Sequence, residues 1–248
     1  MSREAMLAGT TGGIIGTIMG VIGVVWSLVS IAFAVDYSNY SLISLFSQWL
    51  GVGVLGLPYP SSSFLVLVCS IVLGSFLIVS CTLLGVGFWG VYKAGGGAMG
   101  MVGLVFGVVG GTVGGLLIIL GPLMVGIQVI VIFLTPLSTG FEGVFPVFLS
   151  SPNYVFLGIG VVILVVTFIL LGLSSIVVRN MTENSAASTA AGILSIIGGC
   201  LLIFYTLVQG YAPSLAVLGG FLTLVGFILI FTAFILWTIV FFNLHKYI

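Results

Sequence analysis

Long uninterrupted runs of apolar residues, separated by short polar stretches, dominate this chain. Six of them reach the roughly 20 residues that an α-helix needs to cross a hydrocarbon core about 30 Å thick. They cover about residues 8–34, 64–92, 101–134, 154–178, 188–209 and 214–242. Because lipid offers no partner to backbone N–H and C=O groups, only helices suit such runs. The pattern therefore predicts an all-α integral membrane protein, with residues 1–248 forming a single transmembrane domain.

Charged residues are few, and their positions test this helix count. They make up 3% of the chain, against about 25% in soluble domains, and each lies at an end of a run or between two runs. The basic residues precede the first run or follow the second, fourth and sixth: Arg3, Lys93, Arg179 and Lys246. Asp36 and Glu142 lie on the opposite side. The positive-inside rule then predicts three helical hairpins with both termini in the cytoplasm, in the plasma membrane.

The third run is unusually long and contains a helix-distorting pair. A straight helix over its 34 residues would extend roughly 50 Å. Gly121 and Pro122 interrupt the run, and proline removes a backbone donor and clashes with the preceding turn. We expect one tilted helix kinked at Pro122, with a re-entrant segment after Pro122 as the alternative. Gln128 follows two turns later, as an interhelical hydrogen bonder or a substrate contact.

The first outer loop carries a helical pattern of its own. Its apolar residues follow the stripe of an amphipathic helix, with serines and a glutamine on the other side: Leu42, Leu45, Phe46, Trp49 and Leu50. An uncharged polar face of this kind predicts a helix lying in the outer interface. Asn39 begins a glycosylation sequon in the same loop, and this sequence predicts Asn39 as a modification site if any is used.

Small residues recur every four positions in three of the runs. The stripes comprise Gly12, Gly16 and Gly20, then Gly103, Gly107, Gly111 and Gly115, then Ala191, Ser195 and Gly199. Such spacing places residues on one helix face, where small side chains let helices approach closely in lipid. We interpret the stripes as packing surfaces. Sliding during gating, or lining of a narrow pore, is the alternative reading.

Residues able to support chemistry are scarce. The single histidine, His245, lies near the end, and Cys69, Cys81 and Cys200 show no ligand spacing, so we expect no metal, haem or other cofactor. Gly95, Gly97 and Gly100 match a dinucleotide fingerprint, but no strand precedes them, as that fingerprint requires. Zero net charge argues against nucleic acid as a partner. Hydroxyl groups inside the runs are expected to bond back to their own helices: Thr112, Thr167, Ser174, Ser175 and Thr206.

Two functions fit these patterns. The first is a non-catalytic accessory or scaffold subunit, whose partners are membrane lipids and other transmembrane subunits or further copies of itself. Its basis is the set of glycine stripes together with the lack of catalytic groups. The second is a channel or facilitator for a small neutral or lipophilic solute, suggested by the kinked third run, Gln128 and a possible internal repeat of the three hairpins.

Overall fold

The computed structural model describes residues 3–36, 60–134, 153–181, 185–211 and 216–246, which are helical apart from the turn after Lys93. The elements are α1 (Arg3–Asp36), α3 (Pro60–Lys93), α4 (Gly97–Val105), the π-helical η2 (Phe106–Gly110), α5 (Gly111–Leu134), α7 (Asn153–Val177), the 3₁₀-helical η4 (Val178–Met181), α8 (Ser185–Tyr211) and α9 (Ala216–Lys246). Six helices in this part of the chain are long and apolar enough to cross a membrane. The prediction of six apolar helices in an all-α membrane protein is confirmed.

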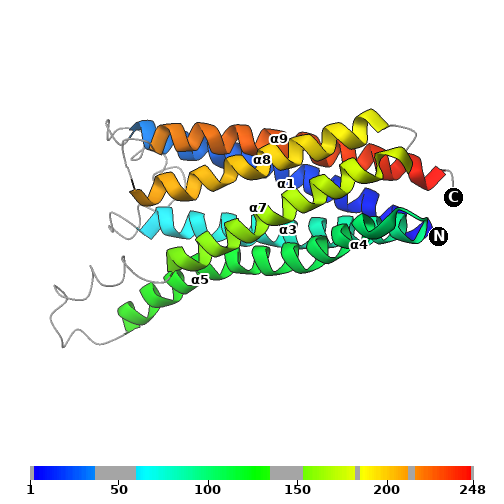
Figure 1. The fold of residues 1–248 in the computed structure, drawn as a ribbon. Helices are drawn as coiled ribbons and strands as arrows, with labels where there is room; N and C mark the ends of the chain where they lie inside the picture. Colours follow the sequence, from blue (N-terminus) through cyan, green and yellow to red (C-terminus); the bar gives the residue numbers. More distant parts are fainter. Residues whose placement is uncertain (1–2, 37–59, 135–152, 182–184, 212–215, 247–248) are drawn as a thin grey trace.

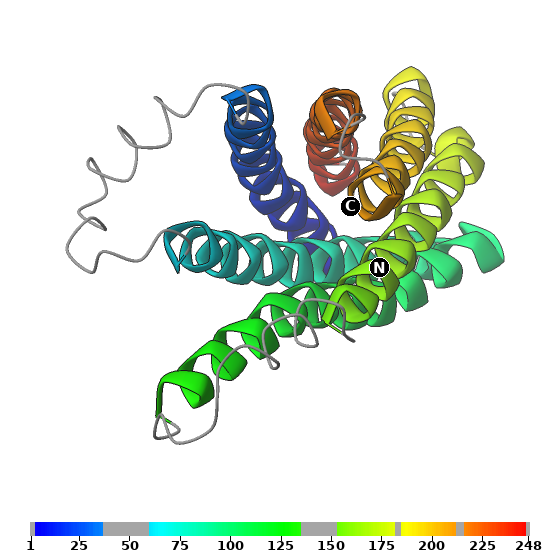
Figure 2. The ribbon, with the colours of Figure 1, turned by 90° about the vertical axis from the view of Figure 1, so that its left-hand side faces the viewer.

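The helices form a closed ring that follows their order in the sequence. Going round it, α1 packs on α3, α3 on the α4–η2–α5 segment, this segment on α7, α7 on α8, and α8 on α9. The last helix, α9, returns to pack along α1. Figure 1 shows the helices side by side, and Figure 2 shows the ring seen along them. Each described helix therefore has two principal neighbours.

The centre of this ring is filled by aromatic side chains. Phe234, Trp237 and Phe241 lie one turn apart along α9 and are at most 1% exposed. Phe241 meets Phe88 of α3 edge to face, with ring centroids 5.4 Å apart. Phe234 meets Phe168 of α7 in the same way at 6.2 Å. The side chains of α9 thus connect α3 and α7 across the ring. Edge-to-face contacts of this kind stabilise a core beyond the area they bury.

The outer surface is apolar on all sides. Each of the six spans exposes large aliphatic or aromatic side chains, for example Ile18 on α1, Val109 in η2, Val166 on α7 and Ile197 on α8. A soluble protein rarely exposes apolar surface so continuously. Together with the six long apolar helices, this exterior identifies the chain as an integral multi-pass membrane protein.

One end of the ring gathers the chain termini and the basic residues. Figure 1 places the N- and C-termini at this end, where Arg3 Nε donates a hydrogen bond to His245 Nε2 at 3.3 Å. Lys93 lies over the ring of Trp89, 3.7 Å from its centroid. After Lys93 the chain reverses through Gly95 at φ 96°, a conformation that glycine adopts without strain. We call this the basic end.

Several sequence predictions concern residues that the structure does not describe. The interfacial helix expected around Leu42 to Leu50, the sequon at Asn39 and the acidic residue Glu142 lie outside the described residues.

Candidate functional site

The glycines of α1 do not share one neighbour. A Cβ added at Gly12 would lie 2.8 Å from the backbone nitrogen of Leu84 on α3. Added at Gly16 or Gly20, it would instead meet Phe234 or Phe231 of α9. In an α-helix, a step of four residues advances about 400°, or about 40° beyond one turn. The every-four spacing therefore drifts around α1, from the α3 side to the α9 side.

A different set of α1 glycines faces α9 throughout. We call it the α1–α9 seam, and its pairs are Gly9 with Phe241, Gly13 with Thr238, Gly16 with Phe234, Gly20 with Phe231, and Gly23 with Phe227. The α1 positions advance by four and three residues alternately, which is the seven-residue repeat that keeps one helix face against a neighbour. Each glycine receives a large α9 side chain, apart from Gly13, which receives threonine. The sequence reading in steps of four missed this seam, and a search for alternating steps would have found it.

The stripe on the third span behaves differently, because all four of its glycines face α3. A Cβ on Gly103 would lie 2.6 Å from Phe88 Cγ, and one on Gly107 would lie 2.7 Å from Gly85 Cα. Gly111 lies against Cys81, and Gly115 lies against Ile78 and the carbonyl of Gly74. This stripe thus faces α3 along its whole length. The shorter stripe on α1 turns from α3 to α9.

The π-helical segment explains this difference. Three steps of four in a regular α-helix would rotate the last glycine about 120° away from the first. η2 lies between Gly103 and Gly111, and a π-helical turn holds about one extra residue, which removes about 100° of that rotation. The remaining drift is about 20° by the same geometry. η2 therefore keeps an every-four stripe aimed at one neighbour.

Glycine also meets glycine at five of the six contacts around the ring. The pairs are Gly9 with Gly87, Gly85 with Gly107, Gly114 with Gly160, Gly172 with Gly192, and Gly198 with Gly226. The α7–α8 crossing is the closest of these, since a Cβ on Gly192 would lie 2.5 Å from the carbonyl oxygen of Gly172. Such contacts bring the backbones together where any larger residue would separate them.

Ser195 and Gly199 of α8 both face α7. The Ser195 hydroxyl donates to the backbone oxygen of Phe168 at 2.9 Å. A Cβ on Gly199 would lie 3.1 Å from Phe168 Cβ. Both positions therefore contact Phe168 of α7.

The hydroxyl groups divide into two kinds. Thr167 and Ser174 bond back to the carbonyls of Ile163 and Leu170, as expected. The prediction for Ser175 is wrong, because its hydroxyl donates across to the carbonyl of Ser188 at 2.8 Å. Ser188 returns a bond to the carbonyl of Ser175 at 2.7 Å. Because α7 and α8 approach closely, the carbonyl on the neighbouring helix lies within reach of each serine hydroxyl. The sequence alone does not reveal this approach. Thr112 stays a prediction, and the Thr206 side chain lies outside the described residues.

The predicted hinge region belongs to one helix. α5 continues from Gly111 to Leu134 through Gly121 and Pro122, so its described backbone is that of a continuous helix and not of a re-entrant segment. Gly121 is buried, and the side chains of Pro122 and Gln128 lie outside the described residues. The kink at Pro122 and the role of Gln128 stay predictions.

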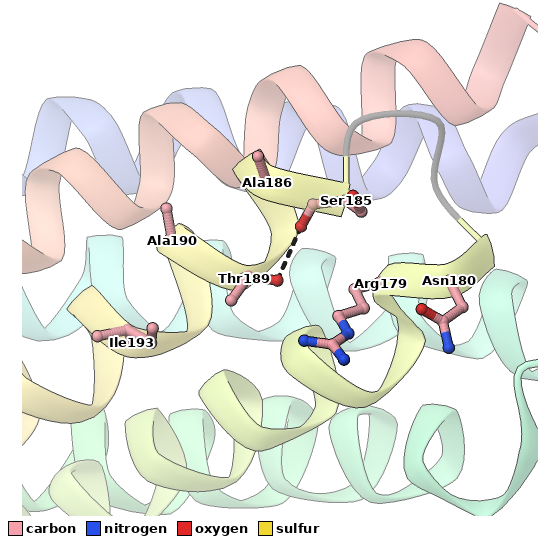
Figure 3. A pocket seen from close by; sticks show the side chains of 7 residues that line it. All are labelled: Arg179, Asn180, Ser185, Ala186, Thr189, Ala190 and Ile193. Carbon is pink, nitrogen blue, oxygen red and sulfur yellow. Dashed lines mark hydrogen bonds between the residues drawn. The ribbon is translucent and has the colours of Figure 1, made fainter.

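Two polar features were not anticipated from the sequence. Trp237 is fully buried at the ring centre, and its indole N–H has no hydrogen-bond acceptor among the described residues. At the basic end, a pocket of about 550 Å³ lies between η4 and α8 (Figure 3). It is lined by Arg179, Asn180, Ser185, Ala186, Thr189, Ala190 and Ile193.

Groups of three or more histidine, cysteine or acidic side chains placed to hold a metal ion do not occur in the described part of the chain. Comparison with protein-family models, curated proteins and solved structures finds no match.

Proposed function

We propose that the protein is a non-catalytic accessory or scaffold subunit of the plasma membrane, which contacts other transmembrane helices through its outer surface. The observation that carries this proposal is the filled interior. Phe88, Phe168, Phe234 and Trp237 are at most 1% exposed at the ring centre. A centre packed with apolar rings supports a structural role, because catalysis and transport need space or polar groups at the reacting site.

The glycine seams would not be available to a partner subunit. The seams between α1 and α9 and between α3 and α5 are occupied within the chain. Contacts with another subunit would therefore use the exposed valine, isoleucine and leucine side chains. Helices associate in lipid through van der Waals packing, interhelical hydrogen bonds and lipid entropy. Since the exposed side chains are apolar, shape complementarity would dominate such an interface.

The protein would have a defined orientation in the membrane. Both termini and the basic end would face the cytoplasm, because Arg3, Lys93, Arg179 and Lys246 all belong to that end. Lysine and arginine in short loops favour the cytoplasmic side. The chain would then cross the membrane as three hairpins in one domain.

Extraction in a mild detergent followed by native mass spectrometry tests the subunit role. We expect a fixed stoichiometry, either with a second copy or with another membrane protein. Ile18→Trp, Val109→Trp and Ile197→Trp each enlarge one exposed face, and one of them should abolish the complex while the unfolding temperature stays unchanged. A monomer at every protein concentration, with no co-purifying membrane protein, would contradict the proposal.

A second candidate function rests on Trp237. An indole N–H at the ring centre that has no acceptor among the described residues suits a facilitator for a small neutral solute, since such a solute needs a hydrogen-bonding group along its path. Uptake of glycerol or urea into proteoliposomes tests it. Trp237→Phe keeps an aromatic ring but removes the donor, so it should slow uptake. Uptake by the unsubstituted protein equal to that of protein-free liposomes would reject this candidate.

A further inference from the structure

The pocket between η4 and α8 has a polar end and an apolar end. Arg179 and Asn180 enter from η4, whereas the other lining residues come from the first turns of α8 (Figure 3). The Thr189 hydroxyl donates a hydrogen bond of 2.8 Å to the backbone carbonyl of Ser185. Further along α8 the lining becomes Ala190 and Ile193. The lining thus changes from charged to apolar in the direction that leads into the span.

The position of the pocket matches the boundary of a bilayer. The apolar span of α8 begins at Ser185. The eight helical steps from Ser185 to Ile193 cover about 12 Å. The polar part of the pocket therefore lies at headgroup level, and Ile193 lies at the level of the hydrocarbon.

An apolar track continues from the pocket along the same helix. Ala186, Ala190, Ile193 and Ile197 follow one another in steps of four and three, which keeps them on one face. Ile193 and Ile197 are 45% and 47% exposed, so this face is open to lipid. From Ser185 to Ile197 the track extends about 18 Å, which is slightly more than half of a hydrocarbon core about 30 Å thick.

We propose that this pocket binds one anionic phospholipid from the leaflet at the basic end, with its phosphate at Arg179 and an acyl chain along the track on α8. Arginine pairs with phosphate through directed, charge-assisted hydrogen bonds. Basic pockets between transmembrane helices recognise such headgroups. The inference goes beyond the subunit role and requires only that the helices span a bilayer.

Native mass spectrometry of the full chain, with phosphatidylglycerol and phosphatidylcholine of identical acyl chains, tests the proposal. We expect one phosphatidylglycerol retained per chain, and Arg179→Gln should weaken its binding about fivefold, the factor associated with one basic residue near a membrane surface. Lys93→Gln is the matched control, because Lys93 also lies at the basic end but does not line the pocket. Equal effects of both substitutions, or equal retention of both lipids, would overturn the proposal.

Two further arms separate the alternatives. Glu183→Gln removes the nearest acid in the sequence and should not weaken binding. A loss as large as that of Arg179→Gln would mean that the connection between η4 and α8, and not the arginine charge, governs retention, which would overturn the proposal. Glycerol 3-phosphate should fail to displace the lipid at equal concentration, since it lacks an acyl chain, and full displacement would reveal a site for a free anion instead.

A measurement on the unsubstituted protein keeps the test independent of any folding defect. Phosphatidylglycerol that carries a photoreactive group in its acyl chain should cross-link to the α8 peptide that contains Ala190 and Ile193. Cross-links spread evenly over all six spans would show an ordinary lipid belt and would overturn the assignment.

Discussion

At the scale of single residues, the meaning of a glycine depends on what its missing side chain would touch. The chain has 37 glycines, so their number alone decides nothing. Gly192 lies against the backbone of Gly172, whereas a Cβ at Gly158 on α7 would meet nothing within 4 Å. The first position brings two helices together and the second does not. Sequence spacing cannot separate these cases, because each depends on a neighbour elsewhere in the chain.

Gly192→Ala and Gly158→Ala should therefore have opposite effects on stability. Overpacking at Gly192 is expected to lower the free energy of unfolding by about 1–3 kcal/mol. Gly158→Ala should leave it unchanged or raise it by up to about 1 kcal/mol, since alanine favours the helix. Unfolding in mixed detergent micelles, followed by circular dichroism, measures both variants. Equal destabilisation would mean that helix propensity, and not the crossing, determines the result.

At the scale of elements, η2 reconciles a four-residue stripe with a helix of 3.6 residues per turn. Its extra residue keeps Gly111 and Gly115 on the side of Gly103 and Gly107. The α1–α9 seam solves the same problem without a π-helical turn, by alternating steps of four and three. The sequence predicted the third span and its stripe, but not the π-helical turn, because that turn is selected by the contact with α3.

Deleting one residue separates these two solutions. Without Val109, which is 56% exposed in η2, the glycines would follow steps of four, three and four, and a regular α-helix would keep them on one face. We expect this variant to fold with an unfolding temperature close to that of the parent.

Removal of Ile14 from α1, an equally exposed position, is the matched control. It would rotate Gly16, Gly20 and Gly23 about 100° away from α9, and we expect loss of the folded ring in size-exclusion and thermal unfolding measurements. If the Val109 deletion proved as damaging as the Ile14 deletion, the role assigned to η2 would be wrong.

At the scale of the whole molecule, six spans place both termini and every basic residue at one end. Cysteines introduced at Ser38 and at Asn184 should consequently react with a membrane-impermeant maleimide from opposite sides. Labelling of intact and permeabilised cells measures this, with the unsubstituted chain as the background control. Reaction of both positions from the same side would rule out the six-span topology.

The sequence was sufficient for the number and type of helices, because length and apolarity are local properties of each span. It was not sufficient for the order of contacts around the ring. The pairing of Gly16 with Phe234 joins the first and last spans, and no local pattern in either one specifies the other. Ser175 shows the same limit at a smaller distance, since its hydrogen bond depends on how closely α8 approaches α7.

The closed order of the ring also has a consequence for biogenesis. From the second span on, each span can dock on the one made just before it, but the seam of α1 needs α9, which leaves the ribosome last. Until then, Gly9, Gly13 and Gly16 face lipid instead of phenylalanine and threonine side chains. The α9-facing side of α1 would therefore stay unpaired through most of the synthesis of the chain. Only insertion of the last helix completes the ring.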